Sequence, residues 1–288
     1  MLMASLLLEV TTQPFSLNAA NFSVFLRVRV SLFAEYPESK RPRAMAFPRF
    51  PVPIMAILRW LIRMPIFFFK ESEFESSFLA SSPRYMHKIA DHIINWQKLE
   101  EALIGDLKVD HATRVLYATD ASVYRKIPLG VAFPKSKEDV AEIVRFAREF
   151  EISVIPRAAG TSLAGQCVGE GLVVDFSRYM TKILEINPKE KWVVVQPGVI
   201  RDQLNEAVEE DALFFGPNTS TANRCMMGGM LGNNSSGTTS IRYGTTRDKV
   251  IELEIVLFDG STASLKEMNR EEIEKGIIGN SAFSDLLK

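Results

Sequence analysis

The sequence feature that most constrains this chain is a run of small residues that directly follows a predicted strand. Residues 154–166 read V-I-P-R-A-A-G-T-S-L-A-G-Q. Small side chains let successive backbone N–H groups point at one spot, and such a concave turn favours a phosphate. The run has neither the Gly-Lys-Ser/Thr of a Walker loop nor the G-x-G-x-x-G pattern. A tight surface turn is the alternative interpretation of this loop taken alone.

A second run of small residues changes that balance. Residues 228–237 read G-G-M-L-G-N-N-S-S-G. Two backbone-cradling segments at this separation predict one extended phosphate ligand held between them, which fits a dinucleotide better than a mononucleotide. For the four polar residues at 233–236, turn and helix-cap chemistry is the alternative to a ligand role.

The segments around the two runs predict a mixed α+β fold. Residues 131–155 read as strand, helix and strand, with Ser136 as the helix cap, and the second strand leads into the first run. The helix has a buried stripe at Val140, Ile143, Val144 and Ala147. We expect a further short helix at 203–208. Further strands are expected at 172–176, 183–186, 192–196, 250–258 and 262–265.

Composition changes sharply along the chain. All 16 glycines lie at or after Gly105, whereas 11 of the 19 phenylalanines lie between residues 15 and 78. We therefore expect residues 1–85 to be an N-terminal extension outside the fold, with a candidate strand at 18–33 and Met86 as an alternative start. The complete division is an extension at 1–85, a helical lead-in at 86–127, the main domain at 128–270 and the start of a truncated region at 271–288.

Composition also limits the partners of this chain. Its net charge is −1, which does not favour nucleic acid. The two cysteines and three histidines show no metal-ligand spacing, so no metal site is expected. The most apolar stretch, at 50–69, contains Arg59, Arg63 and Pro65, which disfavour a membrane-spanning helix. An interfacial helix or a targeting peptide stays open. We expect a cytoplasmic protein, with peripheral association to a membrane left open.

Five ordered motifs together resemble the FAD-binding domain of the vanillyl-alcohol-oxidase (PCMH) type. They are the two small-residue runs with V-Q-P-G-V at 195–199, F-G-P-N-T-S at 215–220 and R-Y-G at 242–244. The resemblance covers roughly residues 109–265. It is nearest to FAD-linked dehydrogenases of D-2-hydroxy acids, such as D-lactate dehydrogenase and the glycolate oxidase FAD subunit. It implies an α+β domain of two subdomains, with the FAD pyrophosphate between them. The change in composition predicts a poorly structured N-terminal segment before this domain.

The resemblance also implies which residues hold FAD. Relatives that attach FAD covalently carry a His where this chain has Thr161, so we expect non-covalent FAD. Arg242 is either a surface ion-pair residue or a group near the flavin or the substrate. The expected cofactor-binding residues are Arg157, Ala158, Ala159, Gly160, Thr161, Ser162, Pro217, Gly228, Gly229, Gly232, Asn234, Ser235 and Gly237.

The implied function is oxidation of a small D-2-hydroxy acid, such as D-lactate or glycolate, by hydride transfer to the flavin. This chemistry needs a base at the hydroxyl and a cation at the carboxylate, and the sequence names no catalytic base. In the resembled family those groups lie largely in a substrate-cap domain after the flavin domain. The alternative is therefore a non-catalytic flavin- or nucleotide-binding fragment, or a subunit that needs a second chain carrying the cap domain.

Overall fold

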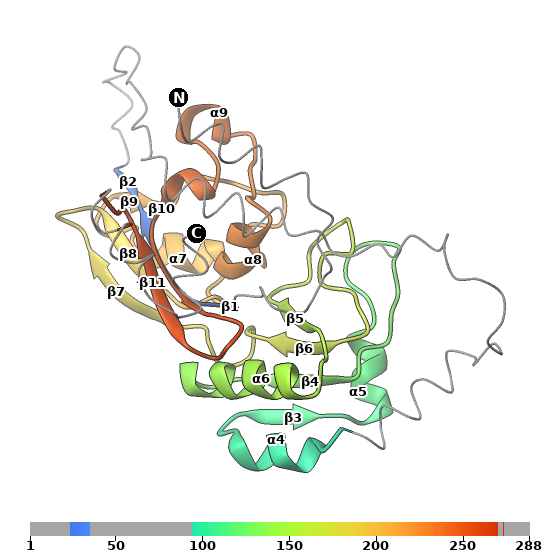
Figure 1. The fold of residues 1–288 in the computed structure, drawn as a ribbon. Helices are drawn as coiled ribbons and strands as arrows, with labels where there is room; N and C mark the ends of the chain where they lie inside the picture. Colours follow the sequence, from blue (N-terminus) through green and yellow to red (C-terminus); the bar gives the residue numbers. More distant parts are fainter. Residues whose placement is uncertain (1–23, 35–93, 270–272, 274–288) are drawn as a thin grey trace, which may run out of the picture.

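The computed structural model describes residues 24–34, 94–269 and 273, which build two sheet-containing halves (Figure 1). The first half comprises residues 94–182, and the second half comprises residues 24–34 and 183–266. Each half has its own buried core cluster. The prediction of an α+β domain with two subdomains is confirmed.

The first half contains a four-stranded sheet in the order β3-β4-β6-β5. Strand β6 pairs in parallel with both β4 and β5, while β3 runs antiparallel to β4. Parallel strands need a crossover, and helix α6 provides it, so the predicted strand–helix–strand unit is confirmed. The lead-in contributes β3 as well as helices. The bounds are α4 Trp96–Ala102, β3 Asp106–Lys108, α5 His111–Leu116, β4 Gly130–Phe133, α6 Lys137–Glu149, β5 Val154–Arg157 and β6 Leu172–Asp175.

Helix α6 forms where its cap and apolar stripe predict it. The Oγ of Ser136 accepts a hydrogen bond from the backbone N–H of Asp139 at 3.1 Å. The Asp139 carboxylate is buried and accepts from the backbone N–H groups of Ile104, Gly105 and Lys135. One carboxylate thus ties the start of α6 to the segment before β3.

The second half contains a five-stranded antiparallel sheet in the order β11-β10-β1-β8-β7, and β2 pairs separately with β9. The helix predicted at 203–208 is present as α7. The bounds are β1 Val24–Ser31, β2 Phe33–Ala34, β7 Ile183–Asn187, β8 Trp192–Val195, α7 Arg201–Ala207, β9 Leu213–Phe214, α8 Met227–Gly232, α9 Ser240–Tyr243, η1 Arg247–Lys249, β10 Val250–Val256 and β11 Thr262–Lys266.

Strand β1 occupies the centre of the second sheet, so the expectation that residues 1–85 lie outside the fold is wrong for residues 24–34. Val28 pairs with Leu253 on one side and with Val195 on the other. Val28 and Val30 are at most 1% exposed. Their alternation with charged residues is the pattern of a half-buried strand, which an average composition over 85 residues conceals. The candidate strand at 18–33 is confirmed over Val24–Ser31; the stretch at 50–69 and Met86 lie outside the described residues.

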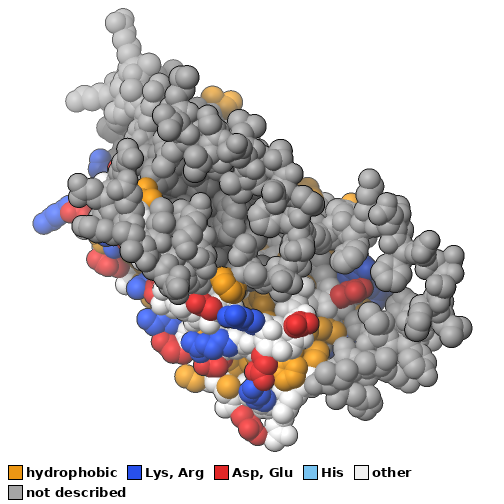
Figure 2. Space-filling view, viewed as in Figure 1, with side chains coloured by type: hydrophobic (Ala, Val, Ile, Leu, Met, Phe, Trp, Pro, Cys, Tyr) orange, Lys and Arg blue, Asp and Glu red, His pale blue; other side chains and the backbone are white. Residues whose placement is uncertain are grey.

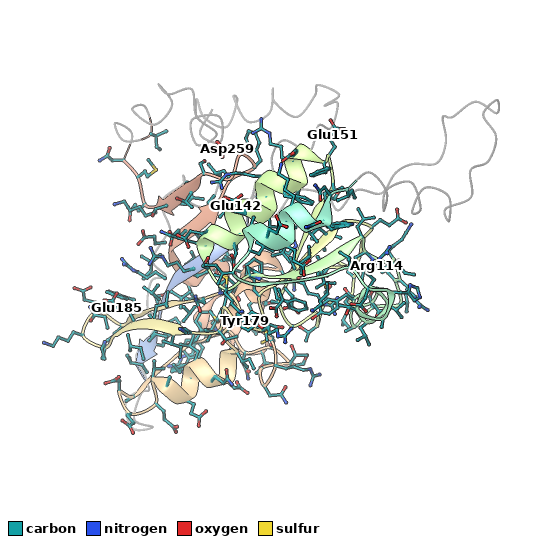
Figure 3. All side chains as sticks on the ribbon, turned by 90° about the horizontal axis from the view of Figure 1, so that it is seen from below. Arg114, Glu142, Glu151, Tyr179, Glu185 and Asp259 are labelled. Carbon is teal, nitrogen blue, oxygen red and sulfur yellow. The ribbon has the colours of Figure 1, made fainter. Side chains whose placement is uncertain are left out.

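Helix α6 connects the two halves. Val256 of β10 belongs to the core cluster that contains the apolar stripe of α6. Arg145 of α6 donates from Nη2 to the carbonyl oxygen of Gly260, in the β10–β11 turn, at 3.2 Å. Figure 3 shows Glu142 of α6 and Asp259 of this turn on the same side of the molecule. The halves therefore share apolar packing as well as a polar contact.

The visible coloured surface in Figure 2 carries interspersed acidic and basic side chains. This mixture agrees with the net charge of −1. Within the described residues, no helix has the length and apolar character needed to cross a membrane. The same part of the chain contains no cluster of three or more His, Cys, Asp or Glu residues placed to hold a metal ion.

Candidate cofactor site

The first small-residue run leaves the carboxyl end of β5 as an open loop. Gly160 has φ +64°, a left-handed conformation that glycine adopts at little cost. The loop is anchored at two carbonyl groups: that of Arg157 accepts from the N–H of Phe176 at 2.9 Å, and that of Gly160 accepts from the N–H of Ala121 at 3.1 Å. Both anchors use carbonyl oxygens, which leaves the N–H groups of the loop available.

Five consecutive N–H groups of this loop have no acceptor in the part of the chain that the structure describes. They belong to residues 158–162. Backbone donors are rarely left without a partner unless water or a ligand provides one. Successive N–H groups around a left-handed glycine form an anion-binding concavity. The loop therefore has the donor arrangement that a pyrophosphate requires.

The second run is an ordered helix with a cap, rather than a second open loop. Residues 227–232 form α8, and Asn234 follows at φ +48°. The N–H of Ser235 donates to the carbonyl oxygen of Met230 at 2.8 Å, which closes a left-handed helix cap. The Oδ1 of Asn234 accepts from the N–H of Arg247 at 3.0 Å. Here the helix-cap interpretation describes Asn234.

The two runs lie against one another, although about 70 residues of sequence separate them. Gln166 donates from Nε2 to the Oδ1 of Asn233 at 2.9 Å. A Cβ atom placed on Gly229 would lie 3.5 Å from the Cβ of Ala158. The carboxyl end of the first sheet and the face of α8 thus border one site, and this is the arrangement in which a ligand could contact both halves.

Nothing in the described protein requires glycine at two positions of α8. Gly229 and Gly232 are exposed, lie three positions apart on one helix face and have helical backbone conformations. A Cβ on Gly232 would meet nothing within 4 Å, and one on Gly229 would make only an ordinary contact. Glycine inside a helix costs about 1 kcal/mol relative to alanine. This face is therefore open to close approach by a ligand, which fits a bound dinucleotide.

The other glycines of the run have steric reasons. A Cβ on Gly237 would lie 1.6 Å from the carbonyl oxygen of Asn218, and one on Gly228 would lie 2.8 Å from the Cβ of Pro197. Gly237 thus lets the run pack against the loop that contains Pro217, whose side chain is buried. The run therefore contains glycines of two kinds, one required by packing and one left open toward the site.

Arg201 holds that loop in place, and the sequence analysis did not single it out. Its Nε donates to the carbonyl oxygen of Pro217 and its Nη2 donates to that of Phe215, both at 3.2 Å. Thr239 donates from Oγ1 to the carbonyl oxygen of Gly216 at 2.8 Å. The partners of Arg201 are backbone atoms 14 and 16 residues away, so no side-chain motif could have revealed this role.

Two further predicted residues, Ser162 and Ser235, have local partners. The Oγ of Ser162 accepts from the N–H of Ala164, and the carbonyl oxygen of Ser235 accepts from the N–H and Oγ1 of Thr246. The guanidinium of Arg242 stacks 5.3 Å from the ring centroid of Tyr243, so both interpretations of Arg242 stay open.

Burial raises the pKa of the Cys167 thiol to about 11, against the opposing effect of the Arg157 charge.

Comparison with known proteins finds a family model and curated relatives that are similar to this chain. Residues 128–266 match the family described as FAD binding domain. The D-2-hydroxyglutarate dehydrogenase of Haemophilus influenzae is 41% identical over 176 residues, which is 60% of this chain and 17% of that protein. The glycolate oxidase subunit GlcD of Bacillus subtilis is 37% identical over 152 residues, 52% of this chain and 32% of that protein. The chain thus spans about a sixth of the first of these curated relatives.

Solved structures share the fold at low sequence identity. The xylooligosaccharide oxidase of Myceliophthora thermophila has a TM-score of 0.51 at 21% identity and covers 62% of this chain and 38% of that one. The p-cresol methylhydroxylase structure has a TM-score of 0.52 at 19% identity and covers 64% and 36%. These likenesses confirm the two-subdomain architecture.

Proposed function

We propose that this chain is the flavin-binding part of an FAD-dependent oxidoreductase of D-2-hydroxy acids, and the match of residues 128–266 to the family described as FAD binding domain supports this proposal. The observation that carries the proposal is the set of five consecutive N–H groups at 158–162, for which residues 24–34 and 94–269 provide no acceptor. These donors would hold the pyrophosphate. The open glycine face of α8 would admit the cofactor from the other side.

FAD would supply the hydride chemistry, and the protein's task at this site is to bind and orient it. The remaining polar residues of the two runs would border the cofactor. Thr161 has a hydroxyl in the first run, which cannot form the histidyl bond of covalently flavinylated relatives. We therefore propose non-covalent attachment.

We propose D-2-hydroxyglutarate as the first substrate to test, and D-lactate and glycolate as the next. The relative named D-2-hydroxyglutarate dehydrogenase is 41% identical, while the glycolate oxidase subunit is 37% identical over a shorter segment. All of these substrates have a hydroxyl beside a carboxylate. They therefore share one reaction, removal of a hydride from the carbon that carries the hydroxyl.

A second candidate function is a flavin-binding module that is completed by another polypeptide segment. This candidate rests on coverage, because the chain spans 17% of the Haemophilus relative. The base and the carboxylate-binding cation would then come from that further segment. The two candidates share the cofactor and differ in whether this chain alone is reduced by substrate.

The test is an absorbance spectrum of the purified chain, with FAD titration, followed by acid precipitation. We expect flavin bands that leave with the supernatant. Anaerobic reduction by D-2-hydroxyglutarate, with the L-enantiomer as control, then separates the two candidates. Bound FAD that no D-2-hydroxy acid reduces would favour the module, and a chain that binds no FAD would refute both.

A matched pair of variants locates the cofactor in that titration. Gly229→Leu places a long side chain in the space between α8 and Ala158, and we expect it to abolish FAD binding. Ala207→Leu adds the same side chain to an exposed position of α7 and should leave the affinity unchanged. Equal affinities of the two variants would exclude the face of α8 from the site.

A further inference from the structure

Two charged residues end neighbouring strands where the first small-residue run begins. Arg157 ends β5, Asp175 ends β6, and the two residues are register partners in the parallel pair. Asp175 is 3% exposed and accepts from the N–H of Ser177 at 2.7 Å. A buried carboxylate needs hydrogen-bond donors, and the N–H of Ser177 is one of them.

Tyr117 provides the next donor and also contacts the guanidinium. Its hydroxyl donates to Oδ2 of Asp175 at 2.6 Å, and the Cζ of Arg157 lies 5.1 Å from its ring centroid. Burial and the neighbouring Asp175 raise the pKa of Tyr117. The phenol therefore stays protonated, and stays a donor, throughout the pH range in which the protein is studied.

The guanidinium group of Arg157 in turn contacts the loop and the segment beside it. Its Nη1 donates to the carbonyl oxygen of Thr119 at 2.8 Å. A Cβ placed on Gly160 would lie 2.6 Å from its Nη2, so the guanidinium lies directly against the left-handed turn of the loop. The N–H of Ala121 donates to the carbonyl oxygen of Gly160. The turn is therefore also bonded to the segment at 119–121, which Arg157 contacts through Thr119.

We propose that Tyr117 and Asp175 are positioning residues that fix the Arg157 guanidinium beneath Gly160 and so keep the N–H groups of residues 158–162 aimed at the pyrophosphate. This inference rests on the proposed FAD-binding function. Asp175 orients the phenol, the phenol ring limits the guanidinium on one side, and the glycine turn limits it on the other. A guanidinium held in this way acts on the cofactor through the loop.

The fold contains its own control for this arrangement. Tyr179 donates from its hydroxyl to Oδ2 of Asp106 at 2.6 Å, and the Cζ of Arg178 lies 5.2 Å from its ring centroid. The same three residue types thus repeat at the β3 edge of the same sheet. Tyr117 directly follows α5, the helix that contains Arg114. Figure 3 shows Tyr179 well apart from Arg114. Loss of one phenol hydroxyl can be compared at two positions.

The decisive experiment compares Tyr117→Phe with Tyr179→Phe in the full chain. We expect Tyr117→Phe to raise the Kd for FAD about tenfold, which is the usual loss for a hydrogen bond to a charged group. Tyr179→Phe should leave the Kd unchanged. Asp175 acts through Tyr117. The double variant with Asp175→Asn and Tyr117→Phe should therefore raise the Kd by a factor smaller than the product of the factors of the two single variants.

A second readout does not need FAD. Trypsin cleaves after arginine only when the side chain enters its pocket, so a fixed Arg157 should resist cleavage. We expect mass spectrometry to detect cleavage between Arg157 and Ala158 much sooner in Tyr117→Phe than in the wild type or in Tyr179→Phe. If the wild type binds no FAD, the proposed function fails, while faster cleavage in Tyr117→Phe would still support the fixed guanidinium. Equal Kd values and equal cleavage rates in the two phenylalanine variants would overturn the inference.

Discussion

The two halves border one site but are built from the sequence in different ways. The first sheet uses four strands from residues 106–175, in one continuous segment. The second sheet combines residues 183–266 with β1, which comes from Val24–Ser31. Their contributions to the site differ too. The first half offers N–H groups that have no acceptor among the described residues, and the second offers the glycine face of α8.

This difference shows that glycines in segments of similar composition can have different structural roles. In the first run, Gly160 allows a left-handed turn that exposes donors. In the second run, Gly237 allows close packing and Gly232 leaves space. Substitutions in the two halves should therefore separate folding from ligand binding, and the four predictions below are ordered by expected effect.

The largest effect is expected where the second half depends on β1. Val30→Asp places a carboxylate at a position that is 0% exposed, and we expect a loss of more than about 4 kcal/mol in the free energy of unfolding. Urea denaturation measures it. Arg27→Gln changes an exposed ion-pair residue on the same strand and should cost at most about 1 kcal/mol. Similar midpoints for both variants would contradict a central position of β1.

The next largest effect is expected at Gly237. An alanine Cβ would overlap the carbonyl oxygen of Asn218, so Gly237→Ala should lower the free energy of unfolding by about 3 kcal/mol through forced backbone movement. Thermal denaturation without FAD measures the change. An unchanged melting temperature would show that the two loops can separate at no cost.

Gly232→Ala should act in the opposite direction on stability. Because its Cβ would meet nothing in the described protein, we expect a gain of about 0.5–1 kcal/mol from higher helix propensity. The same methyl group should weaken FAD binding, measured by quenching of flavin fluorescence. Unchanged affinity together with higher stability would mean that the cofactor does not approach this face.

The last prediction, with the smallest expected effect on the fold, concerns how fast Cys167 is alkylated. Its pKa is raised to about 11, so at pH 8 its thiolate fraction is about 100-fold below that of an ordinary thiol. Iodoacetamide should therefore react slowly with Cys167 in a Cys225→Ser background, and faster as the pH rises toward 11. Rapid reaction at pH 8 would contradict a buried Cys167 thiol in the first half.

The first half and the two glycine-rich runs could be predicted from the sequence because their signals are local. The stripe of α6 repeats within one helix, Ser136 caps it three residues from Asp139, and β5 leads directly into the first run. The second run was harder, since its glycines predict a loop equally well. The structure shows a capped helix instead, closed by the bond from the N–H of Ser235 to the carbonyl oxygen of Met230.

By itself, the sequence determined the fold class, the two small-residue runs and the family that their order indicates. The tertiary structure alone decided that β1 inserts between β8 and β10, that α8 faces Ala158, and that Arg157 lies against the ring of Tyr117. The physical reason is distance along the chain. Strand pairing and side-chain contacts between segments as far apart as Ser31 and Lys249, 218 residues, leave no periodic pattern in the sequence.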